Sequence, residues 1–389
     1  MSSRHLTRRG HARHTQIAAS RSSNSLQDAA ILVEDGTIRR VFNKGEELPK
    51  SDDVFDAAGQ MVVPGFIDMH FHGAMGYETT TDDPKAMPAI GKAKILEGVT
   101  DCCPTTLTLS EEKLAKALNH IEEYRKAPTG AEVIGTHLEG PYVNPECLGA
   151  QNPAYQRNPD TAEIKRLNAV SPVSVITYAI ELPGALQFTE DLLAMGILPS
   201  CGHSNATAAQ FQDGSRRGLR RLTHFCNQMT KLHHREIGLV GTGLCRKEVY
   251  IEMICDKIHL CPDMIDLIFR LKNLDHIILI TDAMEASHLQ PGKYQIGGLD
   301  VIVKDGAARL ASNGALAGSI LHMNDALKNV FEVTGLPLEE LIRTTSLNQA
   351  QELGISDLGR IEAGFRANMV VMDNDFKVKQ VFLRGKKQI

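Results

Sequence analysis

The chain has 389 residues, of which 42% are hydrophobic and 23% are charged, a balance typical of a folded globular protein rather than a disordered one. Lysine and arginine number 42 against 47 for aspartate and glutamate, which gives a formal net charge of −5. This mildly acidic balance argues against a nucleic-acid partner, because a general nucleic-acid binder needs a large positive field. No apolar run reaches the roughly 18 residues of a membrane span, so we expect no membrane partner.

The first 25 residues differ from the rest of the chain. Residues 1–25 contain five arginines and several serines, but no acidic residue and no apolar core of the kind that a secretory signal needs. We expect a disordered basic tail here. An organellar transit peptide also fits this composition, and so does a misplaced start site.

Strand patterns occur next at both ends of the chain. Two apolar runs flank Glu34-Asp35-Gly36, which is a hairpin turn signal. Near the other end, the apolar runs at 367–373 and 378–383 are separated by a polar turn. We therefore predict a small β-sandwich domain formed by both chain ends, from residues 26–63 and 363–389.

The central residues, 64–362, alternate short apolar runs with amphipathic helical patterns, which is typical of βαβ units and a parallel sheet. This pattern predicts an α/β fold of the (β/α)8 TIM-like barrel type. An open doubly wound sheet is the alternative, but no G-x-G-x-x-G follows an early strand, which weakens its dinucleotide-binding form. The candidate barrel strands are residues 65–70, 99–104, 132–139, 173–181, 197–203, 219–224, 249–256 and 277–282.

Imidazole and carboxylate side chains end several of these strands. The carboxyl ends of barrel strands meet at one mouth, and residues two apart on a strand share a face. Such ligands are what a catalytic zinc, iron or manganese site requires. One histidine at a strand end is usually a polar cap, but the agreement of several strands favours a metal centre. The residues are His70, His72, His137, Glu139, His203, His224 and Asp282.

Asp282 directly follows the apolar run 277–281. Beside a metal, its carboxylate can take a proton from water and later donate it to a leaving amine. The alternative is an N-cap for the segment that follows. Given its neighbours, we favour the catalytic role.

The eight cysteines include no C-x-x-C pair, which argues against a zinc ribbon. Disulfide-stapled secreted scaffolds are usually short, and this chain is long. We therefore expect reduced thiols and a cytoplasmic location.

Five motifs carry a resemblance to a known family. VPGFIDMHFHG at 63–73 is similar to the first-strand signature of the amidohydrolase superfamily. HLEGPY at 137–142, GHSNAT at 202–207, THFCNQM at 223–229 and TDAM at 281–284 together resemble the N-acetylglucosamine-6-phosphate deacetylase family. This resemblance runs from about Ile31 to the C-terminus.

The resemblance implies that Glu139, His203 and His224 bind a divalent metal and that Asp282 is the catalytic acid/base. His70 and His72 are similar to the branch of the family that can hold a second metal. We therefore expect one or two divalent ions per subunit, with zinc, iron, manganese and cobalt as the candidates.

The resemblance also implies substrate contacts. Arg235 matches an arginine that reaches a phosphate in the neighbouring subunit, which implies a homodimer. Gln151 stands where some members have histidine, and glutamine can form only neutral hydrogen bonds. The other implied contacts are Ala150, Asn227, Gln228, His259, Leu316, Ala317 and Gly318.

The predicted reaction is therefore hydrolysis of N-acetyl-D-glucosamine 6-phosphate to D-glucosamine 6-phosphate and acetate, in amino-sugar catabolism. The strand 173–181 has no lysine, which argues against hydantoinase-like relatives that bridge two metals with a carboxylated lysine. Deacetylation of the galactosamine isomer, or hydrolysis of a related amide, stays open because nothing in the sequence fixes the stereochemistry at C4. A metal-binding protein without activity is disfavoured, because no ligand and no acid is missing.

Overall fold

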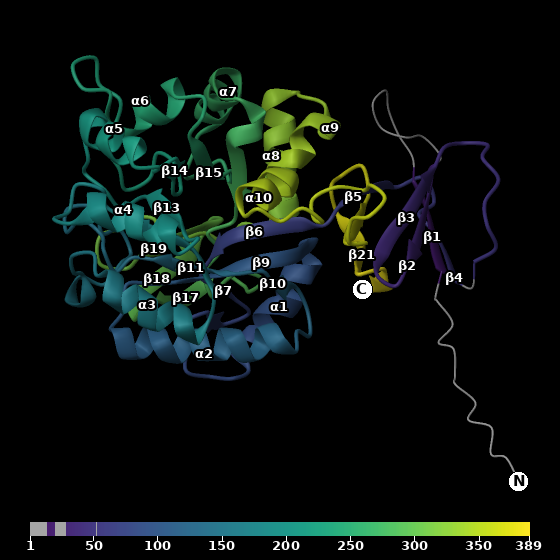
Figure 1. Ribbon diagram of the computed structural model, residues 1–389, viewed down its shortest axis with the longest axis horizontal. Coiled ribbons are helices and arrows are strands. Elements are labelled where there is room, and N and C mark those ends of the chain that lie inside the picture. Colours follow the sequence, from purple (N-terminus) through teal and green to yellow (C-terminus); the bar gives the residue numbers. More distant parts are fainter. Residues whose placement is uncertain (1–13, 20–28, 52) are drawn as a thin grey trace, which may run out of the picture.

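The structure is a computed structural model, which describes residues 14–19, 29–51 and 53–389. Figure 1 shows a large barrel of strands wrapped by helices, and beside it a smaller pair of sheets with strands from both ends of the chain. Among the described residues, no helix is both long enough and apolar enough to cross a membrane.

Parallel strands form the barrel, and each pairs with the next in a fixed order. The barrel closes between its last and first strands. Just after the last strand, the Asp282 amide donates to the His70 carbonyl at 2.8 Å. The predicted (β/α)8 barrel is confirmed. In order, the strands are β6 (Phe66–Phe71), β9 (Val99–Thr106), β11 (Thr136–Glu139), β12 (Val173–Tyr178), β13 (Leu198–Cys201), β14 (Arg221–Leu222), β15 (Tyr250–Ile254) and β16 (Ile277–Ile280).

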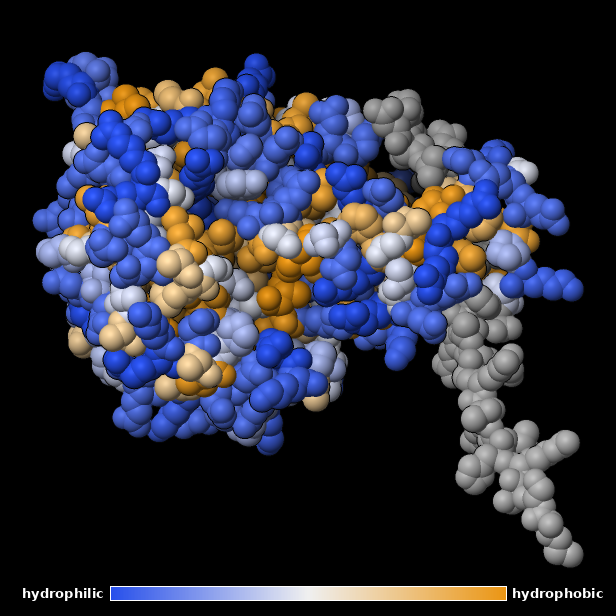
Figure 2. Space-filling view, in the orientation of Figure 1, coloured by the Kyte–Doolittle hydropathy of each residue, from blue (hydrophilic) through white to orange (hydrophobic). Residues whose placement is uncertain are grey.

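Helices cover the outside of the barrel. α2 shows why they form: Ser110 caps its first turn by accepting from the Lys113 amide, and Leu114, Leu118 and Ile121 bury one stripe. In Figure 2, hydrophilic residues dominate the surface over the helices at the rim. The helices are α1 (Ala86–Leu96), α2 (Glu111–Lys126), α3 (Thr161–Val170), α4 (Ala185–Ala194), α5 (Ala208–Arg216), α6 (Gly238–Cys245), α7 (Pro262–Leu271), α8 (Met323–Thr334), α9 (Leu338–Leu341) and α10 (Leu347–Glu352).

The predicted strand at 132–139 is divided in the structure. β10 (Glu132–Val133) pairs with β9 and ends before Ile134, and β11 begins at Thr136. Gly135 separates the two strands, and a Cβ atom at this position would lie 1.8 Å from Ser174 Oγ. The Ile134 amide donates to the Cys102 carbonyl at 3.0 Å, whereas the Thr136 amide donates to the Pro172 carbonyl at 3.1 Å, so the backbone changes partner across Gly135.

An antiparallel sheet that the sequence patterns did not reveal follows β16. It contains β17 (Gly292–Ile296), β18 (Leu299–Lys304) and β19 (Ala307–Leu310). Its buried residues, including Ile296 and Val301, pack with Leu107 and Ala317. A short hairpin, β7 (Gly73–Ala74) and β8 (Tyr77–Glu78), follows β6.

Two four-stranded sheets from the chain ends form the small domain, as predicted. Ile31, Val33 and Ile38 from one sheet pack with Met369 and Phe382 from the other. β1 lies inside the segment predicted as a disordered tail, whereas residues 1–13 and 20–28 lie outside the described residues. The sheets are β3 (Thr37–Phe42), β2 (Ala29–Glu34), β1 (His14–Ala19), β4 (Asp53–Asp56), and β22 (Lys386–Lys387), β21 (Val378–Leu383), β20 (Met369–Met372), β5 (Met61–Pro64).

Candidate metal and active site

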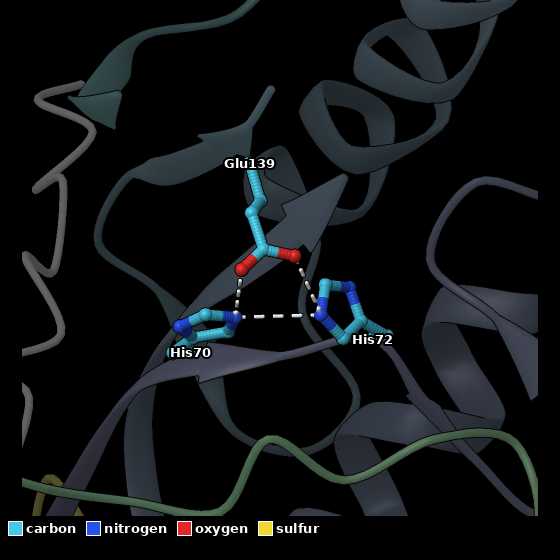
Figure 3. Close-up of side chains that lie close together, drawn as sticks. All are labelled: His70, His72 and Glu139. Carbon is cyan, nitrogen blue, oxygen red and sulfur yellow. Dashed lines mark hydrogen bonds and ion pairs between the residues drawn. The ribbon is translucent and has the colours of Figure 1, made fainter. Parts of the chain in front are cut away.

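Glu139, the last residue of β11, lies at the centre of the site. Its Oε1 is 3.3 Å from His70 Nε2, and its Oε2 is 3.3 Å from His72 Nε2. Figure 3 shows one carboxylate oxygen directed toward each of these two imidazoles. The two Nε2 atoms are 3.3 Å apart, and all three side chains are buried.

The same carboxylate faces two further histidines. Glu139 Oε1 is 3.3 Å from His203 Nε2 and 3.0 Å from His224 Nε2. These two Nε2 atoms are 3.0 Å apart. The structure therefore brings together the metal ligands expected from separate segments of the chain.

Three of the site residues turn sharply at the ends of their strands. The φ angles of His203, His224 and Asp282 are +46°, +30° and +51°, in the left-handed region that residues other than glycine rarely adopt. The turn places Asp282 Oδ1 3.1 Å from His72 Nε2. Backbone strain held at one place by the surrounding structure is typical of a functional site.

The donor set fits a divalent metal. Imidazole nitrogens 3.0 Å and 3.3 Å apart carry lone pairs that repel unless a proton or a cation lies between them. Two groups that share Glu139 each have three donor atoms close together, namely His70–His72–Glu139 and Glu139–His203–His224. Imidazole and carboxylate are ligands for zinc, iron and manganese.

The pKa shifts of the site residues also fit a bound cation. Burial disfavours a charged imidazole, yet Asp282 and Glu139 raise the pKa of His72 to about 9. Burial would also raise the pKa of Glu139, but His70 and His203 hold it well below its ordinary value. Buried carboxylates here are stabilised by positive charge, which a bound cation also supplies.

Glu252, in the middle of β15, was not predicted as a site residue. Its Oε2 lies 2.9 Å from His70 Nδ1 and accepts from the His224 amide at 3.0 Å. Burial would raise the pKa of Glu252, but Arg221 and His70 hold it well below its ordinary value. The available signal was an acidic residue within an otherwise apolar strand.

His137 also lies beside the site, but both nitrogens of its ring contact other protein groups. Its Nε2 is 2.7 Å from Thr177 Oγ1, and its Nδ1 is 3.2 Å from the Met69 carbonyl. Burial, together with the charge of His70, lowers the pKa of His137 to about 3. His137 is therefore a neutral residue that packs behind His70.

A cavity of about 200 Å³ opens above the histidines. Asp256 Oδ2 holds His259 Nδ1 at 2.7 Å, and Asn227 donates to the His224 carbonyl at 3.1 Å. Among the residues implied as substrate contacts, those that line this cavity are Ala150, Gln151, Asn227, Gln228, His259, Leu316 and Gly318.

Two of the implied contacts lie elsewhere. Ala317 is buried in the apolar cluster beneath β18 and does not line the cavity. Arg235 is exposed, and its Nη1 is 2.7 Å from His234 Nε2. Figure 1 shows the segment before α6 at the outside of the barrel, and Arg235 is not among the residues that line the cavity of its own chain.

A separate group, Glu97, His288 and His322, also has donor atoms close together. Glu97 already has partners there, because the Lys94 ammonium lies 3.2 Å from its Oε2 and His288 Nε2 lies 2.9 Å from its Oε1. We interpret this group as a buried ion-pair network.

A barrel with histidines and a shared carboxylate at its mouth defines a metal-dependent hydrolase. The chain belongs to the amidohydrolase family, whose sequence model matches residues 61–387. That family is metal-dependent, in keeping with the donor groups described above.

Within this family the chain is similar to sugar-phosphate deacetylases. It is 36% identical to an N-acetylglucosamine-6-phosphate deacetylase of Lysinibacillus sphaericus over 87% of this chain and 88% of that one. It is also 36% identical to an N-acetylgalactosamine-6-phosphate deacetylase of Escherichia coli O157:H7, over 92% and 94% of the two chains. A solved structure of a mutant N-acetyl-D-glucosamine-6-phosphate deacetylase from Mycobacterium smegmatis, in complex with N-acetyl-D-glucosamine 6-phosphate, has a TM-score of 0.90 at 28% identity and covers 97% and 100%.

Proposed function

We propose that this protein removes the acetyl group from N-acetyl-D-glucosamine 6-phosphate, giving D-glucosamine 6-phosphate and acetate in cytoplasmic amino-sugar catabolism. The observation that carries the proposal is the convergence of Glu139, His203, His224 and Asp282 at the base of one cavity. The similarity to deacetylases of N-acetyl amino-sugar phosphates supports the substrate class.

Glu139, His203 and His224 would hold one divalent ion, and His70 and His72 would complete a second site around Glu139. Zinc, iron, manganese and cobalt are the candidate metals. Such an ion supplies a Lewis acid that polarises the acetyl carbonyl and lowers the pKa of water.

Asp282 moves the proton in this scheme. Burial would raise its pKa, but the hydrogen bond from His72 and the nearby imidazoles hold it below its ordinary value, so the carboxylate is ionised at neutral pH. Asp282 accepts a proton from the attacking water as the new C–O bond forms. It then donates that proton to the sugar nitrogen as the C–N bond breaks, which releases acetate and the free amine.

The rest of the cavity would bind the sugar phosphate. Asn227 and His259 offer polar groups on separate loops, and Ile296 offers an apolar wall. For the phosphate we propose a homodimer in which Arg235 reaches the cavity of the neighbouring subunit. The exposure of Arg235 and its position outside its own cavity support this arrangement.

The galactosamine epimer is a second candidate substrate. The similarity to the Escherichia coli N-acetylgalactosamine-6-phosphate deacetylase matches that to the glucosamine enzyme in identity and exceeds it in coverage. Acetate release from the two epimeric 6-phosphates, measured side by side with added metal, tests both proposals. Higher kcat/KM for the glucosamine epimer supports the first proposal, and absence of acetate from both overturns the deacetylase function.

A further inference from the structure

Glu252 connects the two groups of metal-binding side chains. One of its oxygens, Oε2, lies within hydrogen-bond distance of two donors, His70 Nδ1 at 2.9 Å and the backbone amide of His224 at 3.0 Å. His70 belongs to the group with His72, whereas His224 belongs to the group with His203. Glu252 is fully buried, so water does not compete for this oxygen.

The other oxygen of Glu252, Oε1, pairs with a buried arginine. Arg221 Nη2 lies 2.5 Å from Glu252 Oε1, and Arg221 Nη1 pairs with Glu352 in α10. Arg221 is itself buried and has carboxylates at both ends of its guanidinium. A planar guanidinium held at two points fixes the direction of the carboxylate that it contacts.

This arrangement determines which nitrogen of His70 carries a proton. An ionised carboxylate only accepts hydrogen bonds, so His70 must donate from Nδ1. In the neutral imidazole that binds a metal, Nε2 then carries the lone pair, and this atom lies 3.3 Å from Glu139 Oε1 and 3.6 Å from Asp282 Oδ1. A carboxylate that orients a metal-binding imidazole through its second nitrogen is a common way to fix a ligand.

We propose that Glu252 is a positioning residue that sets the tautomer of His70 and the backbone position of His224, and so aligns both metal groups at once. The proposal rests on the metal-dependent function above. It assigns to the Arg221–Glu252 pair a task at the site in addition to its contribution to the fold.

A matched control variant separates the role of Glu252 at the metal site from its contribution to the fold. Glu163 in α3 is also a buried carboxylate paired with an arginine, Arg157, and with Tyr142, but it lies outside the cavity. Glu163→Gln and Glu252→Gln both remove a buried charge next to an arginine. Only Glu252→Gln changes the partner of a metal-binding histidine.

The test is metal uptake by the full chain, measured by titration with zinc against a competing chelator. We expect Glu252→Gln to bind zinc about 10- to 100-fold more weakly than the unsubstituted protein, while Glu163→Gln binds it equally well. With zinc added, Glu252→Gln should lower kcat more than it raises KM. Unchanged zinc affinity in a folded Glu252→Gln variant overturns the proposal, and so does an equal loss in Glu163→Gln. If the unsubstituted protein takes up no metal, the metal-dependent function itself fails.

A second measurement does not depend on the folding of any Glu252 variant. In zinc-loaded protein labelled with 15N-histidine, the resonances of His70 are identified by their loss in His70→Asn. We expect a proton on Nδ1 of His70 and none on Nε2. A proton on Nε2 overturns the proposal, even if the enzyme is active.

Discussion

The side chain of Gln151 donates to Glu139 Oε2 at 2.5 Å, while its Oε1 accepts from the Thr108 amide at 2.7 Å. The Thr108 bond fixes the orientation of the amide, so its NH2 group must face the carboxylate at the centre of the site. Although Gln151 lines the cavity, it is 3% exposed, and its polar groups already have protein partners. Gln151 therefore holds Glu139 in place as well as lining the cavity.

Replacing Gln151 with leucine should cost stability as well as activity. The variant leaves the buried Thr108 amide and one Glu139 oxygen without this partner, a penalty of about 1–3 kcal/mol in the free energy of unfolding. Urea denaturation measures the loss. Gln187→Leu is the control, because Gln187 is on the surface of α4 and bonds to Asp191 there, so a change within about 0.5 kcal/mol is expected. Equal effects in both variants would contradict the role of Gln151.

Asp101 should make stability depend on pH. Burial raises the pKa of Asp101 from its ordinary value of 3.8 to about 6, and its Oδ1 has no hydrogen-bond partner among the described residues. The folded chain therefore binds a proton that the unfolded chain has released, and the free energy of unfolding falls as the pH rises through this range. Asp101→Asn should remove this slope and be more stable than the unsubstituted protein above pH 6. Parallel curves of unfolding free energy against pH, from about pH 4 to 8, would contradict the expectation.

The barrel was predictable because its strands are buried on both faces and read as apolar runs, as in Ile277–Ile280. The candidate metal ligands could be picked out because His70, His203 and His224 stand where those runs end. The division at Gly135 was not predictable, because the backbone changes partner there from Cys102 to Pro172, and both are distant along the chain. The role of Glu252 was not either, since one acid in an apolar strand does not show which histidine it will meet.

The antiparallel sheet β17–β18–β19 shows another limit. β18 alternates buried and exposed residues clearly, as in Val301 and Ile302, but this alternation says only that one face is covered. That the covering residues include Leu107, and that Ile296 reaches the cavity, follows from packing between distant segments. Within the segment predicted as a basic tail, residues 14–19 form β1, a strand that depends on its pairing with β2 and β4.

Asp282→Asn keeps the shape of the side chain and removes the group that accepts a proton. We expect kcat to fall by about 10² to 10⁴. Metal content should be retained, because Glu139, His203 and His224 are unchanged. Steady-state kinetics and elemental analysis of the same preparation check both statements. Near-normal turnover would remove Asp282 from the proposed mechanism.

Removal of metal should abolish activity and lower the melting temperature. A ligand that binds only the folded state stabilises it by about 4 kcal/mol at roughly a thousand times its Kd. Dialysis against a chelator, followed by return of zinc, iron, manganese or cobalt, should lower and then restore both properties. Glu139→Gln should not respond, because it loses a carboxylate shared by both donor groups. Full activity in protein shown by elemental analysis to lack transition metals would contradict the proposed cofactor.

Arg235→Ala should weaken binding of the phosphorylated sugar without disturbing the metal site. A charge-assisted hydrogen bond to a phosphate contributes about 1.5–3 kcal/mol, so KM should rise roughly 10- to 100-fold. Hydrolysis of the unphosphorylated sugar should change little, since that substrate lacks the phosphate that we propose Arg235 binds. Arg216→Ala is the matched control, because Arg216 is also exposed but pairs with Asp213 on α5.

The proposed homodimer gives the same prediction a second readout. Arg235 does not line the cavity of its own chain, and the proposed role places it at the cavity of a neighbouring subunit. Mixing Asp282→Asn with Arg235→Glu should then restore part of the activity at low substrate concentration, because each mixed dimer places an intact Arg235 against an intact Asp282. Sedimentation at the assay concentration should show a dimer. A fully active monomer would remove the cross-subunit role, and equal losses on both sugars would show that Arg235 supports the fold instead.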